Sequence, residues 1–133
     1  MKKIDHIGIA VNDLKKANKL YSDILGVSPY KTETVESEKV ITSFFKCGDT
    51  KIELLQGVDE TSVISKFIKK KGEGMHHIAF EVEDIKLEII RLKKCGFKVI
   101  NEVPKKGADN KLICFLHPKS TNHVLIELCQ NIK

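Results

Sequence analysis

The chain has 133 residues, of which 41% are hydrophobic and 31% charged, and its formal net charge is +5. This balance fits one folded domain and excludes an intrinsically disordered chain. Arg91 is the sole arginine among 23 basic residues. Because bidentate recognition of bases and phosphates prefers arginine, the composition argues against nucleic-acid binding.

The first hydrophobic stretch of the chain is short and interrupted by Asp5, His6 and Asp13. It is too polar for a signal peptide or a membrane span, so we expect a cytoplasmic protein without a membrane partner. The four cysteines lie far apart without a CxxC pair and are expected to be reduced thiols.

The first half of the chain predicts a β-α-β-β-β module. Apolar residues alternate with small ones from His6 to Val11, which predicts a strand with one oily face and one face that leaves space beside His6. A helix is predicted next, with Asp13 as its N-cap and Gly26 as the residue that ends it. Strands are expected at 40–45 and 51–55. The side of the helix after Asp13 that faces the core is predicted to consist of Leu14, Ala17, Leu20, Tyr21, Ile24 and Leu25.

The second half predicts the same module again. Residues 61–71 have helical spacing and lead to a strand at His77, a helix at 85–94 stopped by Gly96, and further strands near Val99, 113–116 and 124–128. We therefore expect one domain over 1–133, with a first module at 1–56, a linker helix at 57–73 and a second module at 74–133.

The two modules repeat a histidine and a glutamate. The stretch from His6 is echoed from His77 with an offset of 71 residues, and the stretch around Glu53 is echoed around Glu127 with an offset of 74. Two histidines and two carboxylates related in this way form a donor set for one divalent metal with positions left for substrate. The alternative is two surface-facing His/Glu strands without a metal.

Alternation within the strands supports an inward direction for the carboxylates. Apolar residues flank Glu53 and Glu127 on both sides. Because neighbouring residues of a strand point to opposite faces of a sheet, each glutamate is expected on the face opposite to its apolar neighbours. Two curved sheets side by side would then form a cup lined by the four ligands. Register with His6 selects His77 over His76, which we expect to be structural, and His117 and His123 are expected in loops.

The chain resembles the vicinal oxygen chelate superfamily, from Ile4-Asp5-His6-Ile7 to Glu127-Leu128. The most specific stretches, 72–82 and 115–121, look most like the methylmalonyl-CoA epimerase branch. The resemblance implies a paired βαβββ fold of α+β class with a cupped mixed sheet. It also implies a metal held by residues matching His6, Glu53, His77 and Glu127, and a homodimer.

Two reactions compete within this resemblance. Some epimerases carry a further catalytic glutamate on the strand before that of Glu53, and Thr42 stands at the matching position here. The complete His, Glu, His, Glu set favours glyoxalase I (lactoylglutathione lyase), which would act on a thiol-methylglyoxal hemithioacetal. Glu127 and Glu53 would then carry the proton, with Ni²⁺ or Co²⁺ preferred over Zn²⁺.

Two other functions are alternatives to glyoxalase I. The first is methylmalonyl-CoA epimerase, which abstracts a proton next to a thioester, and the lower one is a metal-free protein of the same fold that sequesters small molecules. An extradiol dioxygenase is disfavoured by Glu53, and the absence of tryptophan disfavours the sequestering protein.

Overall fold

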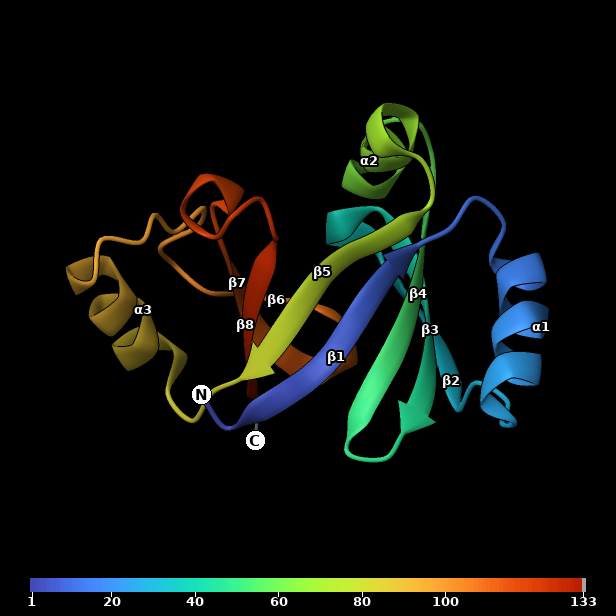
Figure 1. Cartoon of the computed structure of the whole chain (residues 1–133), viewed down its shortest axis with the longest axis horizontal. Coiled ribbons are helices and arrows are strands. Elements are labelled where there is room, and N and C mark those ends of the chain that lie inside the picture. The colour runs from blue at the N-terminus through green and yellow to red at the C-terminus, as the bar shows by residue number, and fades with distance from the viewer. Residues whose placement is uncertain (133) are drawn as a thin grey trace. The chain divides into compact units, whose positions relative to one another are not determined.

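The computed structural model describes residues 1–132, which form eight strands and three α-helices (Figure 1). The predicted α+β class is confirmed. Contacts divide the chain into a first unit, residues 6–76, and a second unit, residues 1–5 with 77–133. The predicted boundaries at 56/57 and 73/74 stay a prediction.

The first unit is a mixed four-stranded sheet with two helices. Its strands run in the order β2-β3-β4-β1, antiparallel except for β1, which is parallel to β4. In chain order the elements are β1 (Lys3–Ala10, inside this unit from His6), α1 (Leu14–Leu25), β2 (Lys31–Val35), β3 (Val40–Cys47), β4 (Thr50–Gly57) and α2 (Val63–Lys71).

Helix α1 begins and ends where the sequence predicts. The Asp13 side chain accepts a hydrogen bond from the Lys16 amide, and Gly26 ends the helix in the left-handed region at φ 71°. The predicted stripe is too wide, however, because Leu20 and Ile24 are 57% and 64% exposed. The sheet therefore buries a narrower face of the helix than the full apolar pattern covers.

The two helices of the first unit pack on opposite faces of its sheet. Helix α1 packs on the face that includes Phe45 and Leu54. Helix α2 packs through Ile64 on the other face, beside Val40 and Leu55. We call this second face the ligand face of the first unit, because strand register places Glu53 on it.

The second unit repeats this pattern with one helix. Its strands run in the order β5-β8-β7-β6, with β5 parallel to β8 and the other pairs antiparallel. Helix α3 covers one face, and the opposite face carries Glu127 and is the ligand face of the second unit. The elements are β5 (Gly74–Glu81, inside this unit from His77), α3 (Ile85–Lys94), β6 (Lys105–Lys106), β7 (Lys111–Leu116) and β8 (Ile126–Asn131).

The strand predicted near Val99 is wrong. Val99 makes only an isolated bridge to Leu116, and the edge strand β6 has two residues. The Asn101 side chain accepts from the Phe115 amide at 3.2 Å and donates to the Ile113 carbonyl at 3.4 Å. A side chain thus occupies places on the edge of β7 that a pairing strand would need.

A glutamine joins the last strand to the helix in each unit. Gln56 Oε1 accepts a hydrogen bond from the Leu14 amide at 2.6 Å, and Gln130 Oε1 accepts from the Ile85 amide at 2.8 Å. Each glutamine follows its glutamate by three residues, so the repeat extends to the N-terminal caps of the helices. In the described part of the chain, none of the helices combines the length and the apolarity needed to cross a bilayer.

Candidate functional site

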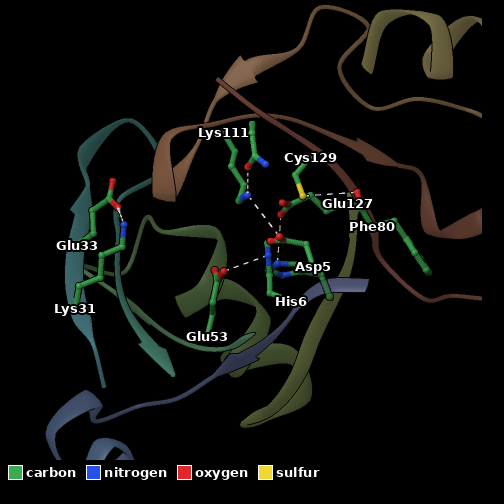
Figure 2. Close-up of polar contacts among 11 residues, drawn as sticks. Asp5, His6, Lys31, Glu33, Glu53, Phe80, Lys111, Glu127 and Cys129 are labelled. Atoms are coloured by element: carbon green, nitrogen blue, oxygen red, sulfur yellow. Dashed lines mark hydrogen bonds and ion pairs between the residues drawn. The ribbon is translucent and has the colours of Figure 1, made fainter. Parts of the chain in front are cut away.

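The first unit pairs a buried histidine with a buried glutamate. His6 Nδ1 lies 3.1 Å from Glu53 Oε2, and both side chains are 5% exposed (Figure 2). The pair forms because β1 runs parallel to β4 and Gly8 is the register partner of Glu53. Since Gly8 has no side chain, the Glu53 carboxylate has room to reach His6.

Strand β4 lies between β3 and β1, so Glu53 is on an interior strand of the sheet. An edge position would have left its carboxylate in water. The carboxylate is instead buried, and a buried charge requires a compensating partner.

The second unit repeats this arrangement. His77 Nε2 lies 3.2 Å from Glu127 Oε1, and both side chains are 6% exposed. Ala79, the small residue two positions after His77, is the register partner of Glu127. Phe115 presents its ring in a T-shaped contact to the His77 ring, with the centroids 6.0 Å apart, and this contact limits rotation of the imidazole.

The donor chemistry of each pair fits a divalent metal. Each pair offers one imidazole nitrogen and one carboxylate oxygen on a buried surface, which are ligands of the zinc, cobalt and nickel class. The register partners of the two glutamates, Gly8 and Ala79, are both small residues. Each unit therefore presents half of the predicted donor set, and the assignment of all four residues to one ion stays a proposal.

His76 differs from its neighbour His77. Its ring packs edge-on against Phe67 of α2, with the centroids 4.9 Å apart. Burial first, and then the charge of Lys71, lower the pKa of His76 to about 4. The ring is therefore neutral at pH 7 and packs as an apolar group.

The other two histidines lie outside the strands. His117 Nδ1 accepts a hydrogen bond from the Lys119 amide at 3.2 Å, at the start of a short 3-10 turn. His123 has a positive φ of 67° in the loop before β8. Both are loop residues, as predicted.

A buried charged cluster around Lys111 was not predicted from the sequence. Lys111 Nζ lies 3.4 Å from Asp5 Oδ1, with side chains 6% and 1% exposed, and also donates to Asn131 Oδ1 (Figure 2). Lys111 and Asn131 are on the ligand face of the second unit, because each is an even number of residues from Phe115 or Glu127. Lys111 alternates with Ile113 and Phe115 on one face of β7, which indicates that it points to the same side as these apolar residues. The many other lysines of the chain hide this pattern, because most lysines lie on protein surfaces.

The cysteines are free thiols, as predicted. Cys114 is fully buried on the α3 side of β7. Burial, and after it the charge of Glu127, raise the pKa of its thiol to about 12. Cys114 is therefore an inert core residue at neutral pH.

Comparison with known proteins identifies close relatives. The chain is 40% identical over 130 residues to the ethylmalonyl-CoA/methylmalonyl-CoA epimerase of Cereibacter sphaeroides, covering 96% of this chain and 97% of the relative. It is 40% identical over 129 residues to human mitochondrial methylmalonyl-CoA epimerase, covering 96% and 73%. A solved methylmalonyl-CoA epimerase in complex with methylmalonyl-CoA and NH4⁺ superposes with a TM-score of 0.92 at 33% identity, covering 98% of this chain and 95% of the other.

These relatives correct the preference for glyoxalase I, which is wrong. The His, Glu, His, Glu set could not separate the two reactions, because both need a metal beside an acidic C–H and a carboxylate to carry the proton. The stretches 72–82 and 115–121 resemble the epimerase branch, to which these relatives belong. Residues 5–115 match the family described as the Glyoxalase/Bleomycin resistance protein/Dioxygenase superfamily. The fold, the repeated His/Glu pairs and this match show that the chain belongs to that superfamily.

Proposed function

We propose that the protein is a divalent-metal-dependent epimerase of 2-alkylmalonyl-CoA thioesters, with methylmalonyl-CoA as its first substrate. The observation that carries the proposal is the buried His/Glu pair in each repeat, at 3.1 Å and 3.2 Å. Relatives of near-equal length that are named as epimerases of this substrate class support it.

The metal ligands in this proposal are His6, Glu53, His77 and Glu127, one histidine and one glutamate from each repeat. When bound, a divalent ion would act as a Lewis acid on a substrate oxygen and so acidify the neighbouring C–H. Two nitrogen and two oxygen donors leave open positions on an ion that accepts six ligands. Co²⁺ and Ni²⁺ are therefore expected to serve better than Zn²⁺, which prefers four.

The protein carboxylates carry the proton. In methylmalonyl-CoA the reacting carbon lies between a thioester and a carboxylate, and its C–H bond breaks to give the thioester enolate. We propose that Glu127 or Glu53 takes this proton and that the other carboxylic acid returns one to the opposite face, which inverts the centre. The pairing of each glutamate with a histidine fixes the direction of its carboxylate.

The test is an epimerisation assay on protein loaded separately with Co²⁺, Ni²⁺ and Zn²⁺. One epimer of methylmalonyl-CoA in D₂O should become a mixture of both epimers and take up one deuterium at the reacting carbon. The glutathione-methylglyoxal hemithioacetal, as a control substrate, should remain unchanged. Failure of every metal-loaded form to epimerise or exchange would reject the function.

Two further properties are proposed from the sequence alone. We propose a homodimer, to be checked by light scattering of the metal-loaded protein. We also propose a cytoplasmic location, to be checked by cell fractionation.

A further inference from the structure

Thr42 carries a buried hydroxyl on the ligand face of the first unit. The residue is 1% exposed, and its Oγ1 has no hydrogen-bond partner among residues 1–132. A buried hydroxyl left without a partner lowers the stability of the folded state. Its presence therefore needs a reason that lies outside the packing of the sheet.

Strand register places this hydroxyl near the His6–Glu53 pair. Thr42 is the register partner of Leu55 on β4, and Phe44, two residues further along β3, is the partner of Glu53. Residues two apart in a strand share a face, so Thr42 and Glu53 point to the same side. Diagonal neighbours of this kind have Cα atoms about 7–8 Å apart, a separation that one acyl group of a substrate can span.

The fold itself does not require a hydroxyl here. The equivalent residue of the second unit is Ile113, two before Phe115, which is the register partner of Glu127. Ile113 is 7% exposed and packs with Ala79 and Cys129. An apolar branched side chain thus fills the same place in the repeat without a polar group.

The neighbouring hydroxyl on β3 is satisfied by the protein. Ser43 points to the opposite face and its Oγ lies 3.4 Å from Oγ1 of Thr32 on β2. Ser43 is 0% exposed, so it is as deeply buried as Thr42. Among these two adjacent hydroxyls, the one on the ligand face lacks a partner, and we take this as the mark of a ligand contact.

We propose that the Thr42 hydroxyl donates a hydrogen bond to an oxygen of the substrate's acyl group. This inference rests on the proposed function and identifies a substrate-binding residue of that site. The oxygen belongs to the thioester carbonyl or to the free carboxylate of the 2-alkylmalonyl group. A threonine hydroxyl is too weak an acid to carry the proton as a carboxylate would, so proton transfer stays with the two glutamates.

The test replaces Thr42 by valine, which keeps the branched shape and removes the hydroxyl. A lost neutral hydrogen bond to substrate is expected to lower kcat/KM for methylmalonyl-CoA about threefold to tenfold. The melting temperature of the free protein should rise by about 2–5 °C, because the unpartnered hydroxyl is gone. Ser43→Ala is the matched control and should lower the melting temperature and leave kcat/KM unchanged.

The kinetic parameters decide which oxygen is bound. A fall in kcat at constant KM supports a bond to the thioester oxygen, on which negative charge grows as the C–H bond breaks. A rise in KM at constant kcat supports a bond to the free carboxylate. An active wild type with unchanged kcat and KM in Thr42→Val would overturn the inference and leave the proposed function standing.

Binding gives a readout that does not depend on turnover. Calorimetry with methylmalonyl-CoA on metal-loaded Glu127→Gln, with and without Thr42→Val, should show a Kd about threefold to tenfold weaker in the double variant if the bond forms in the bound substrate. Equal Kd values together with unchanged kinetics would reject the contact. An inactive wild type would reject the function alone, since the difference in Kd would still report the contact.

Discussion

The ligand faces of the two units differ most at the end away from their His/Glu pairs. In the first unit, Val40 lies there in an apolar cluster closed by Ile64 of α2. In the second unit the position equivalent to Val40, 71 residues on, is Lys111, which is buried with Asp5 and Asn131. The two repeats therefore share the His/Glu pairs and the helix caps, and they differ in this closure, which is apolar in the first unit and charged in the second.

This difference has a physical reason. The end of a sheet face must be covered from water, and either apolar side chains or an ion pair with satisfied hydrogen bonds can cover it. The two His–Glu separations are similar, at 3.1 Å and 3.2 Å, although His6 faces its glutamate through Nδ1 and His77 through Nε2.

The largest effect is expected from removing the glutamate of one repeat at a time. Glu127→Gln is expected to lower kcat by about 10²–10⁴-fold, the usual contribution of a general acid–base group. Glu53→Gln should have an effect of the same order if both glutamates carry protons. Steady-state epimerisation and the metal content of each purified variant are the measurements.

Deuterium exchange separates the roles of the two glutamates. A variant that retains one proton carrier should still exchange the α-proton of one epimer and fail to invert it. Near-normal turnover in Glu127→Gln with full metal content would show that this residue carries no proton.

The charged closure of the second unit should be costly to break. Lys111→Met removes the partner of buried Asp5 and is expected to destabilise the fold by about 3–5 kcal/mol, as seen when one member of a buried pair is removed. Urea unfolding measures this loss. The double variant Asp5→Asn with Lys111→Met should regain most of it, and a loss that stays additive would mean that the ion pair is not the cause.

The smallest expected effect concerns the paired glutamine caps. Gln56→Ala and Gln130→Ala each remove one acceptor for a helix N-terminal amide and should cost about 0.5–2 kcal/mol, in the range of other cap losses. Equal losses in urea unfolding would support equivalent structural roles in the two repeats. A loss confined to one variant would show that the other helix start finds a substitute acceptor.

Much of this molecule was predictable because its signals are local. The caps Asp13 and Gly26 fixed α1, and alternation around Glu53 and Glu127 gave the direction of both carboxylates. The strand near Val99 was mispredicted because its place is taken by the Asn101 side chain, a contact between residues 12 and 14 apart. Long-range contacts of this kind leave no periodic trace in the sequence.

The Lys111 cluster and the Thr42 hydroxyl show the same limit for the site. Each residue type is ordinary on a protein surface, and only the register of the strands shows that it is buried. The choice between two reactions failed for another reason, because the ligand residues are common to both chemistries.

The division of the chain into units has a consequence for any attempt to separate its halves. The second unit includes Met1–Asp5, so its Lys111 is neutralised by a residue from the opposite end of the sequence. Proteolytic cleavage between His76 and His77 would leave Lys111 in the C-terminal fragment with its hydrogen bond to Asn131 but without the counter-charge of Asp5. The N-terminal fragment would have to remain associated to supply the counter-charge, and the two halves would behave as mutually dependent pieces of one folding unit.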